Sequence, residues 1–220
     1  MIKKTTLTLI ALAAFAYSSA HAQSFTPISP DALGITAGST DINTAFDISS
    51  NLGLSAGSVT LEIANGNTNA GNAFVVSDSI STTYTFRGTT PVDAFVNHGR
   101  NLGSPSFTNG TGVPRDGVTA ASGESFTLTS AITSDYTAGS SGNDFFVDYT
   151  GTDTGILAEN SNGFVFTSDQ PVSNFTVFTT NTSDLDNGFG IAVRVSAVPE
   201  PTAGVILALG GLLALRRRRN

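Results

Sequence analysis

The chain has 220 residues, of which 40% are hydrophobic and only 12% charged, and its formal net charge is −7. It contains no Cys, so a disulfide framework and a Cys-ligated metal are both excluded. Sixteen acidic residues and four Arg lie between Gln23 and Ala197, and this net charge of −12 disfavours binding to nucleic acid.

The N-terminus has the parts of a secretory signal peptide in the right order. Two lysines precede an apolar run at 7–17, and Ala20 and Ala22 are the small residues of a cleavage site. We predict that signal peptidase removes residues 1–22, so that the mature chain begins at Gln23 and is exported across the inner membrane.

The body, residues 23–197, shows the period-2 alternation typical of half-buried strands. Clear alternation occurs at 59–63, 83–87, 125–129, 145–149, 164–166, 174–177 and 191–196. Turn-forming clusters lie at 65–67, 138–143, 160–163 and 186–188, and Asn162-Gly163 is a hairpin signal. We predict an all-β body of nine to eleven antiparallel strands in two packed sheets, a jelly-roll-like β-sandwich with a Phe-rich core.

Three further expectations concern the body's organisation. Residues 24–40 are expected to form loop or edge structure. Residues 97–123 lack alternation and are rich in Gly, Ser, Pro and Asn, which predicts the longest loop. No internal repeat with a fixed period is evident.

Catalytic residues are not predicted. The mature body has one His, His98, which we interpret as a solvated loop residue, and no Gly-x-Ser-x-Gly elbow occurs. Asp144 and Asp148 would share one strand face with backbones about 13 Å apart. That spacing exceeds the roughly 5–9.5 Å of glycosidase carboxylate pairs. A cross-strand pair that includes Glu62 stays open, because one sequence does not show it.

A calcium loop is the main metal hypothesis to weigh. Asp184, Asp186 and Gly188 resemble the first half of such a loop, but the closing Glu is missing. Asx residues in a turn between strands explain the same letters, and we favour the turn. Asp153 and Asp169 are interpreted as loop residues in the same way. No cofactor and no metal ligand are therefore assigned.

The C-terminus, residues 198–220, combines two prolines, a short apolar run and a basic cluster. The run 202–215 would reach about 21 Å as a helix, shorter than a hydrocarbon core of about 30 Å. Arg216, Arg217, Arg218 and Arg219 follow it and would stay on the cytoplasmic side. We predict a short transmembrane helix that holds the chain in the membrane transiently. A plain C-terminal anchor is the alternative.

This tail resembles the PEP-CTERM sorting signal of Gram-negative bacteria in all its parts. The motif is Pro199-Glu200-Pro201, followed by the apolar helix and the Arg cluster. The resemblance covers the tail alone. It implies recognition by an exosortase, a membrane-embedded processing enzyme, with cleavage near the motif and release to the cell surface or extracellular matrix. It also implies an exopolysaccharide or biofilm context.

The expected function is accordingly that of a non-enzymatic surface or matrix protein, structural or adhesive. Its expected partners are signal peptidase, the exosortase-type enzyme, the membrane before processing, and extracellular polysaccharide. Two alternatives remain open: a carbohydrate-binding module, with or without calcium, and a polysaccharide hydrolase.

Overall fold

The computed structural model describes residues 24–77, 79–98, 115–132, 134–150, 163–180 and 187–196. These residues form an all-β fold, as predicted, with two short 3-10 turns, η1 (Asp31–Leu33) and η2 (Ser50–Leu52). The strands are β1 (Thr26–Ile28), β2 (Ile42–Asp47), β3 (Val59–Thr68), β4 (Phe74–Val76), β5 (Thr82–Gly88), β6 (Val92–His98), β7 (Arg115–Ala120), β8 (Phe126–Leu128), β9 (Tyr136–Ser141), β10 (Asp144–Tyr149), β11 (Phe164–Ser168), β12 (Asn174–Thr180) and β13 (Asn187–Val195).

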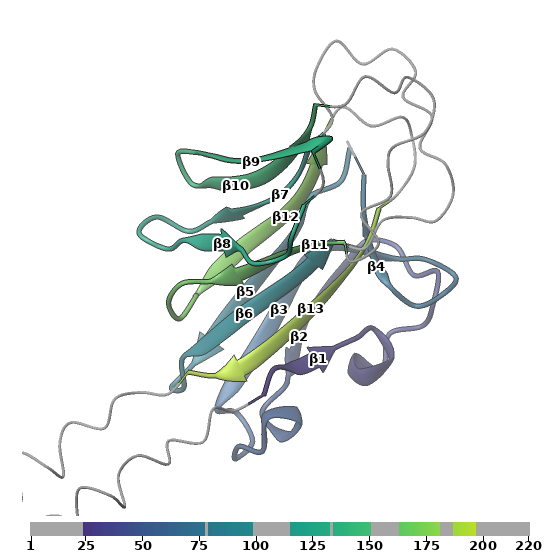
Figure 1. Cartoon of the computed structure of the whole chain (residues 1–220). Coiled ribbons are helices and arrows are strands. Elements are labelled where there is room, and N and C mark those ends of the chain that lie inside the picture. Colours follow the sequence, from purple (N-terminus) through teal and green to yellow (C-terminus); the bar gives the residue numbers. More distant parts are fainter. Residues whose placement is uncertain are drawn as a thin grey trace, which may run out of the picture. The chain divides into compact units, whose positions relative to one another are not determined.

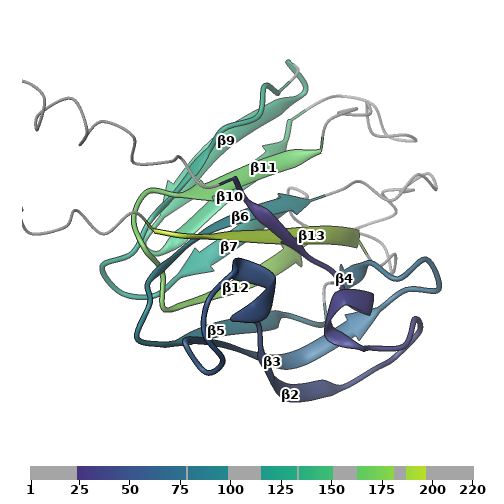
Figure 2. The ribbon, with the colours of Figure 1, turned by 90° about the horizontal axis from the view of Figure 1, so that it is seen from below.

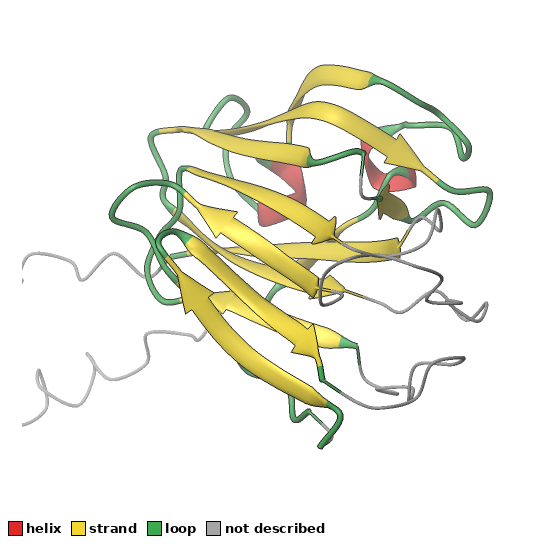
Figure 3. Ribbon diagram, turned by 90° about the horizontal axis from the view of Figure 1, so that it is seen from above, coloured by secondary structure: helices red, strands yellow, loops and turns green. Residues whose placement is uncertain are grey.

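The strands follow one hydrogen-bonded path, β8-β11-β6-β13-β4-β3-β5-β12-β7-β10-β9, with β1 added to β13 and β2 added to β3 (Figure 1). Every pairing is antiparallel. The sheet curls until its two halves face each other (Figure 3). We call β8-β11-β6-β13-β4 with β1 the first half, and β3-β5-β12-β7-β10-β9 with β2 the second half. The two halves are joined through the pairing of β3 with β4 into one sheet that nearly closes on itself.

The core lies between the two halves and is built around aromatic side chains. Phe175 of β12 is fully buried and lies 5.5 Å, ring centre to ring centre, from Phe126 of β8 in the opposite half. Tyr84 of β5 stacks on Phe175 at 5.2 Å and meets Phe189 of β13 edge-on at 5.9 Å. Because large rings bury 150–250 Å² each, such contacts between the halves supply much of the apolar burial.

β3 carries the chain from one half to the other through a bulge. Its first part pairs with β2 and β5, and its last two residues pair with β4. Asn65 has φ 56°, and the register with β2 shifts between Ile42 and Thr44. The turn predicted at 65–67 is therefore wrong: these residues bend a strand, which is the usual effect of an extra residue in an antiparallel ladder.

Two loops on either side of β2 repeat one sequence, LGITAGS at 33–39 and LGLSAGS at 52–58. In both copies the glycine after the 3-10 turn has positive φ, at 73° and 69°, and the serine that ends the copy bonds to the carbonyl three residues earlier. The leucine and the next aliphatic residue of each copy pack against the core. This short repeat, with copies that start at Leu33 and Leu52, thus specifies two similar loops.

All seven strands predicted from alternation are present. The long loop predicted at 97–123 is wrong at both ends, because β6 extends to His98 and β7 begins at Arg115. The turn predicted at 138–143 is mostly β9, with only residues 142 and 143 between paired strands. Residues 24–40 contain the outlying strand β1, which pairs only with β13 among the described strands, as expected for edge structure.

The described body is one compact unit, Ser24–Ser196, whose two ends emerge side by side. Thr26 of β1 pairs with Val193 of β13, so the first and last strands run together (Figure 2). The Arg194 guanidinium lies 4.6 Å from the centre of the Phe25 ring and bonds to Asp93 at 2.8 Å. The two ends of the described body therefore lie close together.

Candidate functional site

The predicted processing residues lie outside the described part of the chain. These are Ala20, Ala22 and Gln23 at the signal cleavage site, the motif Pro199-Glu200-Pro201, and the cluster Arg216–Arg219. Their roles stay predictions. Within the ranges that the structure describes, no helix is long and apolar enough to cross a membrane.

His98 is a buried core residue, and its interpretation as a solvated loop residue is wrong. It ends β6 with 1% of its surface exposed and faces the opposite half, where its Nε2 donates to the Gly117 carbonyl at 3.0 Å. Burial lowers the pKa of His98, although Asp116 and the Gly117 bond act in the other direction. The sequence already indicated this burial, because His98 continues the inward-facing period-2 row of Val92, Ala94 and Val96.

Asp144 and Asp148 share the outer face of β10, as predicted, but each has its own structural partner. The Thr119 hydroxyl donates to Asp144 Oδ1 at 2.7 Å. Asp148 accepts two bonds from the Arg115 guanidinium, at 2.6 and 2.9 Å, and this pairing raises the pKa of Arg115. The two carboxylates thus tie strands together and do not converge on a substrate.

The calcium hypothesis gains no support from the described residues. Asp184 and Asp186 lie outside them, whereas Asn187 and Gly188 are already in β13, opposite β4. Within the described ranges, no three acidic or His side chains are grouped as metal ligands. Asp153 is also outside, and Asp169 is a loop residue that accepts a bond from the Ser125 hydroxyl at 2.7 Å.

The outer surface of the second half carries a regular array of hydroxyl groups, which we call the hydroxyl face. One cross-strand row runs through Thr83, Thr176, Thr119, Asp144 and Ser141 on five neighbouring strands. The Thr83 and Thr176 hydroxyls are 3.3 Å apart. Neighbouring strands are about 4.8 Å apart, so the row presents hydrogen-bonding groups at that repeat. Sequence alternation indicated outward Thr side chains, but the row itself depends on strand order.

The next row of the hydroxyl face alternates Phe with Gly: Phe178, Gly117, Phe146 and Gly139. A Cβ on Gly117 would lie 2.5 Å from Phe178 Cζ, and one on Gly139 would lie 2.7 Å from Phe146 Cε2. Each ring therefore lies directly over a glycine of the next strand. Arg115 covers Phe146 with its Cζ 3.4 Å from the ring centre, which leaves the half-buried Phe178 as the more accessible ring.

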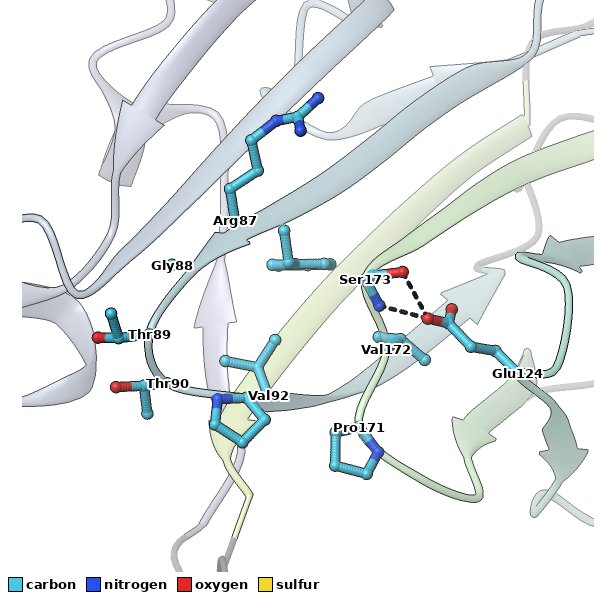
Figure 4. Close-up of a pocket in the computed structure, with 11 residues that line it drawn as sticks. Arg87, Gly88, Thr89, Thr90, Val92, Glu124, Pro171, Val172 and Ser173 are labelled. Atoms are coloured by element: carbon cyan, nitrogen blue, oxygen red, sulfur yellow. Dashed lines mark hydrogen bonds between the residues drawn. The ribbon is translucent and has the colours of Figure 1, made fainter.

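A hollow of about 280 Å³ lies where β5 and β12 reach the edge of this face (Figure 4). Its walls come from the turn between β5 and β6 and from the segment before β12, and they include Arg87, Thr89, Thr90, Pro91, Pro171 and Ser173. Arg87 bonds to Glu62 at 3.2 Å on the exposed surface, so Glu62 pairs with a base and not with another acid.

Glu124 forms the acidic wall of the hollow. Its Oε1 accepts bonds from the Ser173 N–H at 2.7 Å and the Ser173 hydroxyl at 2.6 Å (Figure 4). Its Oε2 is buried and has no hydrogen-bond partner among the described residues. The hollow thus combines a fixed carboxylate and hydroxyl groups with an apolar wall that includes Phe86, Val92 and Val172, a mixed lining in which a few polar groups could orient a ligand.

Comparison with known proteins identifies no relative. No family model matches the chain, and neither a curated protein nor a solved structure is significantly similar to it.

Proposed function

We propose that the chain is an exported, exosortase-sorted protein of the cell surface or extracellular matrix, with a structural or adhesive, non-enzymatic body. The observation that carries the proposal is the tail: Pro199-Glu200-Pro201, an apolar run too short to span a membrane comfortably, and four terminal arginines. Exosortase, signal peptidase, the membrane and extracellular polysaccharide are the partners of this proposal.

The body's geometry supports this assignment in two ways. Its first and last strands pair, and Ser196 N–H bonds to the Pro91 carbonyl at 2.9 Å, so the two ends of the described body lie close together. A signal peptide and a sorting tail would then be attached at neighbouring ends of the body. The acids considered for catalysis are also engaged in structural contacts. The two facing halves favour a jelly-roll-like sandwich as the finer description of the fold.

Intact mass spectrometry of the protein released from cells tests the sorting proposal. We expect a chain that begins at Gln23 and ends near Pro201. A variant with Ala at Pro199, Glu200 and Pro201 should remain in the membrane fraction, whereas Thr127→Ala on the exposed part of β8 should be processed normally. A released product that still carries Arg216–Arg219 would contradict sorting by cleavage.

A carbohydrate-binding role is the second candidate, favoured by the hydroxyl face and the hollow beside it. The absence of Trp from the chain leaves Phe178 as the ring on which a sugar could stack. We expect the full chain to bind glycans on an array, and Phe178→Ala or Glu124→Gln to weaken that binding. Thr167→Ala, on the outer face of the first half, is the matched control. Repeating the array with calcium and with a chelator distinguishes calcium-assisted binding from calcium-independent binding. No glycan signal in either condition would exclude a carbohydrate-binding role.

A further inference from the structure

The strand β9 ends the sheet path and is open on one edge. It pairs with β10 and with no other described strand. Its first residue, Tyr136, is buried, but every residue from Thr137 to Ser141 is exposed. The hairpin of β9 and β10 lies at the end of the sheet in Figure 1. Five consecutive residues therefore present a sheet edge to solvent.

This edge lacks the devices by which proteins usually block strand addition. Residues 137–141 read Thr-Ala-Gly-Ser-Ser, with no charge and no proline. The register between β9 and β10 is continuous from Tyr136 to Ser141, so no bulge turns the edge away. Edges without lysine, proline or bulges are open to pairing with another strand. The small side chains add little steric hindrance to that approach.

The edge is also held in strand geometry before any partner arrives. Glycine normally weakens a strand, but the Phe146 ring lies over Gly139 and covers its backbone. Arg115 fixes that ring from above, and Asp148 fixes Arg115 through two hydrogen bonds. The stack from β7 to β9 lowers the entropy that the edge would lose on pairing.

We propose that two copies of this chain associate edge to edge through β9, antiparallel about a two-fold axis at Gly139. This register places Thr137 of one copy opposite Ser141 of the other, and Ala138 opposite Ser140. Ser141 and Asp144 flank the two-residue turn, so they form a hydrogen-bonded pair, and the main-chain groups of Ser141 point toward β10. Hydrogen-bonded and non-hydrogen-bonded pairs alternate along an antiparallel ladder, so the main-chain N–H and C=O groups of Ser140 and Ala138 point to the free edge. The proposed register lets these outward groups meet.

A second copy fits this edge better than a foreign segment. The edge offers no charge to recruit a basic or acidic partner, and its hydroxyl pairs are self-complementary under the two-fold axis. A pairing of five residues buries far less than the roughly 1,200 Å² of a stable complex, so the contact is weak and favours copies concentrated at a surface. This inference does not depend on the exosortase proposal.

Cysteine cross-linking tests both the contact and its register, because the chain has no Cys of its own. We expect that full-length T137C and S141C proteins, mixed and oxidised, form a disulfide-linked dimer on a non-reducing gel. Each variant alone should stay monomeric, because its own cysteine in the second copy is about 13 Å away. Disulfides need Cα atoms within about 7 Å. Cross-linking of either variant alone to the extent seen in the mixture would overturn the register, and no excess dimer in the mixture would overturn the contact.

A charge on the edge separates edge pairing from chance collision. Adding Ala138→Lys to both cysteine variants places two ammonium groups in the contact and should abolish the mixed dimer. Ser55→Lys, in an exposed loop next to η2, is the matched control and should leave the dimer unchanged. Equal melting temperatures of the lysine variants would show that each body is folded. A mixed dimer that persists with Ala138→Lys would refute the proposal.

Discussion

Gly117→Ala tests whether the outer face of the second half is as tightly packed as the structure indicates. A Cβ at this position would lie 2.5 Å from the Phe145 carbonyl oxygen and 2.5 Å from Phe178 Cζ. The ring can turn away, but the carbonyl belongs to the neighbouring strand, so β7 and β10 must move apart. Overpacking of this kind costs about 1–3 kcal/mol. In a domain of this size each kcal/mol lowers the melting temperature by about 2–4 °C.

Gly190→Ala is the matched control, because Gly190 is also in a strand but has no atom within 4 Å of the added Cβ. It should leave stability unchanged or raise it by up to about 1 kcal/mol, since alanine loses less entropy than glycine on folding. Thermal and urea unfolding of both variants provide the measurement. Phe178→Ala combined with Gly117→Ala should recover only part of the loss, because the carbonyl contact remains. Equal stability of the two single variants would refute the close approach of β7 to β10.

Three further predictions concern buried or bonded polar groups. His98 has a lowered pKa in the folded state, so the unfolded state binds its proton more readily. The unfolding free energy should therefore fall as pH drops through about 6.5, and His98→Gln should remove that fall in urea titrations. Tyr84→Phe should raise the unfolding free energy by about 1 kcal/mol, because the buried hydroxyl has no hydrogen-bond partner among the described residues. A lower unfolding free energy of this variant would contradict that reasoning and show that the hydroxyl is hydrogen-bonded. Bonds from Ser49 and Gly57 lower the pKa of Asp47, so it stabilises the fold above its usual value of 3.8 and less as pH falls below it. Asp47→Asn should reduce this loss of stability at low pH, which melting temperatures measured over a range of pH values would show.

Strands with one buried and one solvent-exposed face could be predicted because apolar and polar side chains alternate along them. Thr83 to Arg87 and Phe175 to Val177 show that pattern, and both segments form strands. β6 was not predicted from alternation because its inward face ends on a polar residue, His98, and its outward face includes Phe95. β9 was not predicted because, beyond Tyr136, neither of its faces is buried, and its sequence therefore does not need to alternate apolar and polar residues.

The sequence by itself determined the charge of the body and predicted its all-β class, and the proposed export signal and sorting tail rest on it alone, because each of these depends on local order or composition. Only the tertiary structure showed that His98 reaches Gly117 across the core and that Thr83, Thr176 and Thr119 form one row. It alone showed that β9 ends the sheet. These features depend on which strands become neighbours, and that order results from packing both halves around one aromatic core, which no single strand encodes.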